Sequence, residues 1–100
     1  MFPGLTSKMS EGAISLAAVI TPKSDIVHVT STATTTVITT IIPPFGGFSG
    51  VMVLVNRSGG TLSAVTTGNV ALAVASIPQN QTCLFVYSKL TGKWYPGAIS

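Results

Sequence analysis

The stretch from Pro43 to Asn56 constrains the fold of this chain more than any other part of the sequence. Its double proline ends whatever precedes it, because proline has no N–H to donate to a strand ladder and its ring fixes φ. The run Val51 to Val55 then prefers β structure without interruption and is apolar on both faces of the pleat. Such a strand has to be covered on both faces, and in a chain of this size a second subunit can supply one cover. We therefore expect a subunit interface at Val51, Val53 and Val55.

Residues 25–100 carry the pattern of a single β domain. Short runs of β-branched and aromatic residues alternate with turn signals such as Asn-Arg-Ser-Gly-Gly at 56–60. The runs expected to form strands are 26–31, 35–42, 51–55, 61–66, 70–75, 82–87 and 94–95. Helix is the competing interpretation for Asn69 to Ser76, because three alanines lie in this segment. Short strands at this spacing predict an all-β fold, a small antiparallel β-sandwich or barrel.

Residues 1–24 are expected to form an extended N-terminal arm that precedes this domain. The segment mixes isolated large apolar residues with turn formers and shows no sustained period. Within it, Ile14 to Ile20 is a candidate strand. The separated residues Phe2, Leu5 and Met9 are anchors of the kind with which an extended arm holds a partner surface. The alternative is a frayed terminus, although disordered tails tend to contain fewer such residues.

Charged side chains are scarce, and this favours a protein that functions in contact with other proteins. Seven of the 100 residues are charged, whereas a soluble domain typically carries about 25%. Serine and threonine, 25 residues in all, supply the polarity instead. Hydroxyl groups keep a surface hydrated without electrostatic repulsion between neighbouring proteins. The composition therefore suits a protein that functions in an assembly. The alternative is a monomer that its hydroxyl groups keep in solution.

Several classes of function are excluded by composition. A net charge of +3 with scattered cations does not indicate a nucleic-acid-binding protein. Every apolar run falls short of the roughly 18 residues of a membrane-spanning helix. The apolar run 13–20 is followed by Pro22 and Lys23 where a signal peptide would need small residues. Cys83 is the single cysteine, so we expect a buried thiol, no intrachain disulfide and no cysteine-rich zinc site, as in a protein made in a cytoplasm.

No set of residues carries a catalytic signature, and we expect neither an enzyme nor a cofactor. His28 is the single histidine, and Glu11 and Asp25 flank its strand without the spacing of an acid–base pair or a metal site. The Gly-rich segment 46–50 lacks the strand–turn–helix context of a hydrolase nucleophile. Trp94 and Tyr95 have two interpretations: aromatic residues that close the core, or exposed rings that stack on a sugar or anchor an interface.

The second half of the chain resembles a β-rich module of tailed-bacteriophage virion proteins. The motifs that carry the resemblance occur in order: Ile-Ile-Pro-Pro-Phe-Gly-Gly-Phe-Ser-Gly at 41–50, Val-Met-Val-Leu-Val at 51–55, Thr-Thr-Gly-Asn-Val-Ala-Leu-Ala at 66–73, and Leu-Phe-Val-Tyr-Ser-Lys-Leu-Thr-Gly-Lys-Trp-Tyr-Pro at 84–96. The resemblance covers about residues 28–96. Two departures are Arg-Ser-Gly-Gly at 57–60, where the module has an acidic turn, and the lack of a preceding fibre-forming segment.

The resemblance implies a structural protein of the virion, either a capsid decoration (cement) protein, a head fibre or the end of a tail fibre, often trimeric. An arm followed by a bare module fits the decoration protein best. The expected partners are further copies of the chain in a homotrimer and the major capsid protein or another virion protein, on the capsid surface of a particle made in the host cytoplasm. The alternative is a receptor- or glycan-binding module of a phage tail fibre or head fibre, with Trp94 and Tyr95 in contact with the ligand.

Overall fold

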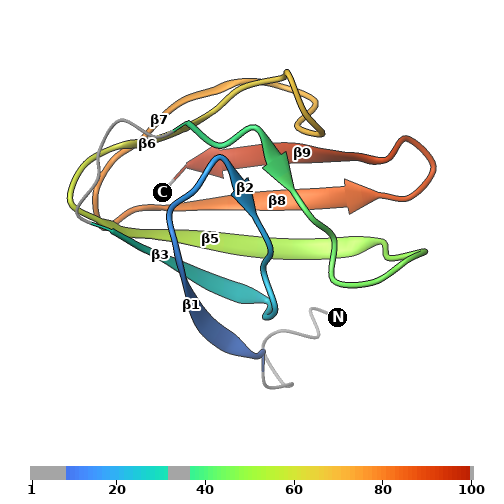
Figure 1. Cartoon of the computed structure of the whole chain (residues 1–100), viewed down its shortest axis with the longest axis horizontal. Helices are drawn as coiled ribbons and strands as arrows, with labels where there is room; N and C mark the ends of the chain where they lie inside the picture. The colour runs from blue at the N-terminus through green and yellow to red at the C-terminus, as the bar shows by residue number, and fades with distance from the viewer. Residues whose placement is uncertain (1–8, 32–36, 100) are drawn as a thin grey trace.

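The computed structural model describes residues 9–31 and 37–99 of the chain, and these residues form an all-β fold (Figure 1). Within these two ranges no helix has the length and hydropathy that a membrane crossing requires. The strands are β1 Glu11–Ser15, β2 Val19–Ile20, β3 Ile26–Ser31, β4 Thr40–Ile41, β5 Gly50–Ser58, β6 Leu62–Ala64, β7 Val74–Ile77, β8 Thr82–Ser88 and β9 Lys93–Ile99.

Five of these strands form one sheet in the order β1-β3-β5-β8-β9. Strands β5, β8 and β9 are antiparallel neighbours, whereas β1, β3 and β5 run parallel. The expected antiparallel arrangement is therefore found for β5, β8 and β9, whereas β1 and β3 depart from it. Parallel neighbours need a crossover connection, and here the crossovers carry β2 and β4, which pair with each other. In Figure 1, β2 and β4 lie across the five-stranded sheet.

The second layer consists of the β2–β4 pair and the antiparallel β6–β7 pair. A bridge between Ile38 and Ala64 joins them, with hydrogen bonds from Ile38 N to Ser63 O at 2.9 Å and from Val65 N to Ile38 O at 3.0 Å. The two layers enclose one hydrophobic core, whose buried side chains include Ile20, Val27, Val29, Ile41, Met52, Leu54, Leu62, Ile77, Phe85 and Trp94. The predicted small β-sandwich is confirmed, and it is not a closed barrel.

Much of the segment 1–24, which the sequence analysis assigned to an N-terminal arm, belongs to the β-sandwich. β1 is an edge strand of the large sheet, and β2 lies in the second layer with Ile20 in the core. The β domain therefore begins by Glu11 instead of Asp25. A backbone hydrogen bond from Ile26 N to Ser10 O at 2.9 Å fixes the start of β1 against β3. Met9 is half-buried, and Phe2 and Leu5 lie outside the described residues.

The segment 69–73 forms neither the predicted strand nor the competing helix, because its polar and apolar side chains hold the two layers together. Asn69 Oδ1 accepts a hydrogen bond from Ile41 N at 2.8 Å, and its Nδ2 donates to Ile41 O at 2.7 Å. Val70 is fully buried and forms an isolated parallel bridge with Trp94. Regular strand structure begins only at Val74.

Candidate functional site

The strand β5 presents its two apolar faces to different environments. Met52 and Leu54 point into the core, whereas the side chains of Val51, Val53 and Val55 point to the side of the sheet that faces away from the second layer. Val51 is 45% exposed, and Val53 and Val55 are half-buried. We call this side the outer face. The three valines that the sequence assigned to a subunit interface thus lie together on the outer face.

Apolar residues of the neighbouring strands continue this surface. The strand register aligns Val53 with Ile26 on β3 and with Leu84 on β8. The same register aligns Val51 with Val86 on β8, and Val86 with Tyr95 on β9. Leu84 and Val86 are each 40% exposed, and Tyr95 is 39% exposed. Together these residues form the outer apolar patch: Ile26, Val51, Val53, Val55, Leu84, Val86 and Tyr95.

The outer apolar patch extends both across and along the strands. It crosses four strands, about 14 Å at a strand spacing of about 4.8 Å, and follows β5 for five residues, about 17 Å at about 3.3 Å per residue. With its side chains it therefore covers about 300 Å², in the range where an apolar patch on a soluble protein is often functional. Within the described residues no element covers it.

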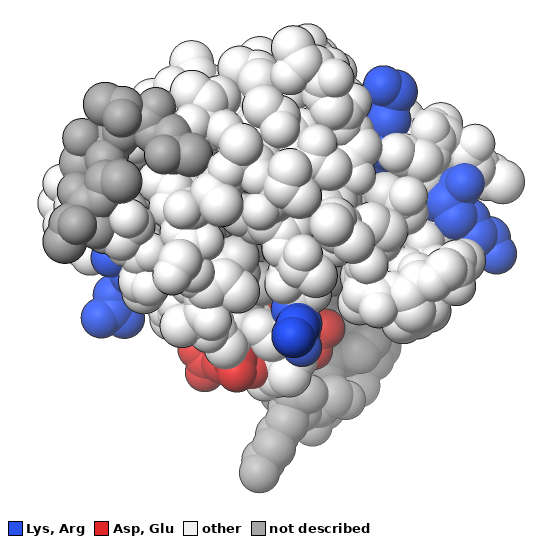
Figure 2. All heavy atoms as spheres, viewed as in Figure 1, with Lys and Arg blue, Asp and Glu red and all other residues white. Residues whose placement is uncertain are grey.

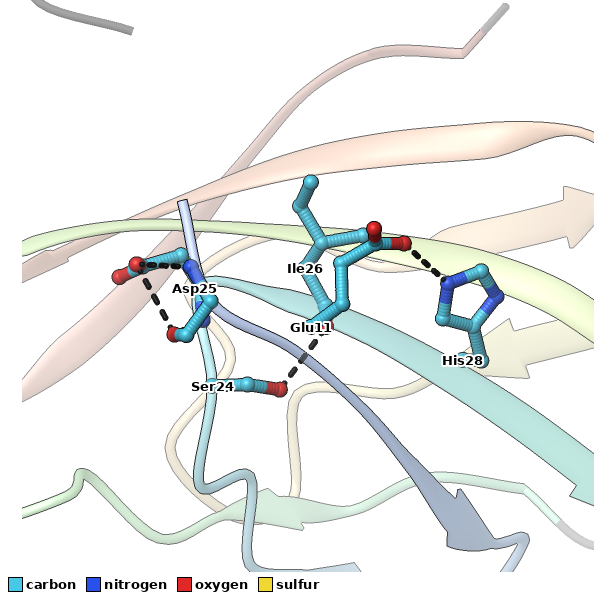
Figure 3. A network of polar contacts seen from close by, with 6 residues as sticks. Glu11, Ser24, Asp25, Ile26 and His28 are labelled. Atoms are coloured by element: carbon cyan, nitrogen blue, oxygen red, sulfur yellow. Dashed lines mark hydrogen bonds and ion pairs between the residues drawn. The ribbon is translucent and has the colours of Figure 1, made fainter. Parts of the chain in front are cut away.

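Polar contacts between β1 and the start of β3 border this patch, and we call them the β1–β3 clasp (Figure 3). His28 Nε2 lies 2.8 Å from Glu11 Oε1, and the register places His28 beside Val55. The Asp25 Oδ2 atom accepts hydrogen bonds from the backbone N–H and the hydroxyl of Ser10, both at 3.0 Å. The buried His28 Nδ1 atom has no hydrogen-bond partner among the described residues.

The clasp gathers the titratable residues that the sequence analysis weighed, and it places them in structural contacts. Glu11 and Asp25 hold successive positions of the same two strands together instead of facing a common cavity (Figure 3). Among residues 9–31 and 37–99, no group of three or more histidine, cysteine, aspartate and glutamate side chains lies close enough to hold a metal ion.

Trp94 and Tyr95 lie on opposite faces of the sheet. Trp94 is 1% exposed, and its Nε1 donates a hydrogen bond to Ile41 O at 2.9 Å, so it is a core residue with a satisfied polar atom. Its ring therefore offers almost no exposed surface to a ligand. Tyr95 belongs to the outer apolar patch, and its hydroxyl donates to Thr91 Oγ1 at 3.0 Å. Of these two aromatic residues, only Tyr95 is therefore placed to contact a partner.

A further exposed aromatic ring, which the sequence analysis did not select, lies at the glycine-rich corner before β5. Phe45 is 63% exposed, and its ring centroid lies 5.4 Å from that of Phe48 in an edge-to-face arrangement. Phe48 in turn packs 6.0 Å from Trp94, so the corner is anchored on the core. Gly50 permits this packing, because a Cβ atom there would lie 2.9 Å from the Phe48 ring. An aromatic residue between the double proline and two glycines is the sequence signal that identifies this position.

Cys83 on β8 is fully buried, as the sequence predicted. Burial raises the pKa of its thiol above the usual value, because a thiolate would lose its hydration there. The raised pKa and the lack of access make this thiol a packing residue.

The opposite side of the molecule, formed by the second layer, is also nearly free of charge. Figure 2 shows Lys, Arg, Asp and Glu at the periphery of this side and none at its centre. Its exposed apolar side chains include Val19 on β2 and Leu72 in the loop before β7.

The candidate site is therefore a surface, the outer apolar patch, bordered by the β1–β3 clasp. In comparisons with protein-family models, with curated proteins and with solved structures, the chain finds no match in any of the three.

Proposed function

We propose that this chain is a non-enzymatic structural protein of a virus particle, a capsid decoration (cement) protein. It forms homotrimers, and it binds to and stabilises the shell through contacts with the major capsid protein or another virion protein. The observation that carries the proposal is the outer apolar patch, a strand-aligned apolar surface on a chain with seven charged residues. The phage-like motifs at 41–55 and 84–96 support the virion assignment.

Burial of the outer apolar patch drives trimer formation. At about 25 cal/mol per Å², covering about 300 Å² contributes about 7 kcal/mol. Association costs about 4–15 kcal/mol in lost freedom of motion, so one such contact is weak alone. A closed ring of three subunits repeats the contact three times, and it also gives each trimer several attachment points on a shell.

Attachment to the shell depends on the residues that precede β1. Because β1 and β2 belong to the β-sandwich, the binding segment is shorter than the arm expected from the sequence and ends at the β1–β3 clasp. In this proposal, Phe2 and Leu5 contact the shell protein, and Met9, which is half-buried, joins the segment to the body.

The test is the molar mass of the purified protein by light scattering across a range of concentrations, with Val51→Asp as the disruptive variant. Val51 is exposed, so the substitution puts a charge into the outer apolar patch without opening the core. Leu72→Asp is the matched control, because Leu72 is exposed in a loop of the second layer. At concentrations too low for association through any surface other than the outer apolar patch, we expect a trimeric mass for the wild type and for Leu72→Asp, and a monomeric mass for a folded Val51→Asp variant.

A second measurement addresses attachment. The wild-type trimer should co-sediment with shells assembled from the capsid protein, and deletion of residues 1–8 should abolish co-sedimentation while the trimer remains. A monomeric wild type at all concentrations, or a Val51→Asp variant with the wild-type mass, would contradict the trimer. A trimer that does not bind shells would contradict the decoration role.

A further inference from the structure

The two edges of the five-stranded sheet differ in how far they are protected from pairing with another strand. The β9 edge is closed. Trp94 N donates to Asn69 O and Ala71 N donates to Trp94 O, both at 2.8 Å, so a loop occupies this edge. Pro96 has no N–H to offer, and the register shifts between Cys83 and Phe85 on the neighbouring strand. Prolines, irregular register and covering loops are the usual devices that protect a sheet edge.

At the β1 edge, the described residues include no proline, no register shift and no loop that is hydrogen-bonded to the strand. Hydrogen bonds from Ile26 N to Ser10 O at 2.9 Å and from Leu16 N to Thr30 O at 3.2 Å show which backbone groups of β1 face β3. Because these groups alternate along a strand, the N–H and C=O groups of the residues between them face away from β3. The residues whose backbone N–H and C=O groups face away from β3 are Glu11, Ala13 and Ser15. All three residues are exposed.

A groove of about 350 Å³ lies beside this open edge, lined by Glu11, Gly12, Ala13, Ile14, Thr21, Lys23 and Ser24. Gly12 keeps the groove open along the strand, since it has no side chain and a Cβ atom there would lie 3.1 Å from Ser24 Oγ. A strand added to β1 would place every second side chain in this groove and the others on the outer face.

We propose that β1 is an association site that pairs with β1 of a second copy, antiparallel, about a twofold axis through Ala13. In this register Glu11 lies opposite Ser15 of the second copy, Gly12 opposite Ile14, and Ala13 opposite Ala13. The large side chain of Ile14 thus faces the residue that has none, and each carboxylate faces a hydroxyl donor. No like charges meet, so the strand is complementary to itself.

The β1–β3 clasp holds this edge ready for pairing. The contacts of Ser10 with Asp25 and of Glu11 with His28 fix β1 against β3, so its free N–H and C=O groups are already aligned (Figure 3). Pairing through β1 extends the sheet in its own plane and leaves the outer apolar patch accessible. The β1 contact is therefore separate from the proposed trimer contact. It joins two trimers through one β1 strand of each.

The first test is sedimentation velocity of the full chain as wild type, Ala13→Pro and Ala13→Ser. Proline removes the outward N–H of residue 13 at the twofold axis, whereas serine keeps it. We expect the wild type and Ala13→Ser to contain a species of at least twice the mass of Ala13→Pro, with association of Ala13→Pro weakened at least about tenfold by the lost reciprocal hydrogen bonds. Equal masses for the three proteins would overturn the proposal.

The second test identifies the register and does not depend on the folding of the proline variant. Ala13→Lys and Ala13→Glu each put like charges opposite each other at the axis, so each variant alone should lose the doubled species at low salt. An equimolar mixture of the two should recover it. Loss without recovery in the mixture would exclude pairing of residue 13 with itself.

The two proposals fail separately in these experiments. If the trimer is absent, the β1 contact converts monomers into dimers, and Ala13→Pro returns monomers. If the β1 contact is absent, the wild type remains a trimer and Ala13→Pro has no effect on its mass.

Discussion

The two faces of the five-stranded sheet are built from the same strands and from adjacent residues of similar hydrophobicity, yet one face is buried and the other is exposed. On β8, Phe85 is buried and its neighbour Val86 is exposed; on β9, the same holds for Trp94 and Tyr95. The inner face is covered by the second layer, and the outer face has no cover in the described part of the chain. An apolar side chain therefore stabilises the monomer on one face and is available for association on the other.

The largest effect should come from the aromatic pair on β9. Trp94→Ala removes a buried indole and its hydrogen bond to Ile41 O, and we expect it to lower the free energy of unfolding by about 3–5 kcal/mol. Tyr95→Ala should lower it by less than about 1 kcal/mol, because Tyr95 is on the outer face. Urea denaturation under conditions that keep both variants monomeric measures the difference. Similar losses for the two would show that the outer face is also covered.

The second-largest loss of stability should come from replacing a buried side-chain amide on the inner face. Asn56 Nδ2 donates to Gly60 O and to Ile77 O, both at 2.7 Å, and Asn56 Oδ1 accepts from Ser58 N at 2.9 Å. Asn56→Ala removes all three of these hydrogen bonds, and Gly60 O keeps another donor, the Ser58 hydroxyl at 3.0 Å. We expect a loss of about 2–4 kcal/mol in the free energy of unfolding. Arg57→Ala, at the exposed neighbouring position, should change it by less than about 0.5 kcal/mol. Thermal unfolding of both variants measures the difference. Equal melting temperatures for Asn56→Ala and Arg57→Ala would contradict the prediction.

Replacing valine by threonine separates the two faces with one change of chemistry. Val29→Thr buries a hydroxyl in the core, and we expect a loss of about 1–3 kcal/mol in the free energy of unfolding with no direct effect on association. Val86→Thr keeps the β-branched shape at an exposed position, so the free energy of unfolding should change by less than about 1 kcal/mol. The trimer of this variant should dissociate at a higher protein concentration than the wild-type trimer. Denaturation and light scattering on the same samples test both statements. A Val86→Thr variant with unchanged association would argue against the outer apolar patch as the interface.

The smallest effect should come from the border of the outer face. Glu11→Gln replaces the exposed partner of His28 in the β1–β3 clasp, and an exposed ion pair contributes at most about 1 kcal/mol. We expect a small loss of stability, detected as faster amide hydrogen exchange in β1 with little change in the rest of the sheet. Uniformly faster exchange across the sheet would contradict a local role for the clasp.

Local patterns in the sequence were sufficient for several elements. The predicted strand 26–31 coincides with β3, 82–87 falls within β8, and 51–55 falls within β5. The all-β fold and the burial of Cys83 were also predicted correctly. These features depend on side-chain alternation, β-branched residues and turn formers within a few positions, and such signals are visible in the sequence itself.

The tertiary structure alone decided which strands pair and which face is bare. The parallel pairing of β1, β3 and β5 and the buried position of Val70 depend on contacts between residues far apart in the chain. Alternation along β5 indicated two apolar faces, but only the path of the crossovers put the second layer over Leu54 and left Val51, Val53 and Val55 outside. A strand's period determines that its side chains alternate. The layer that packs against the sheet determines which of them become core and which become surface.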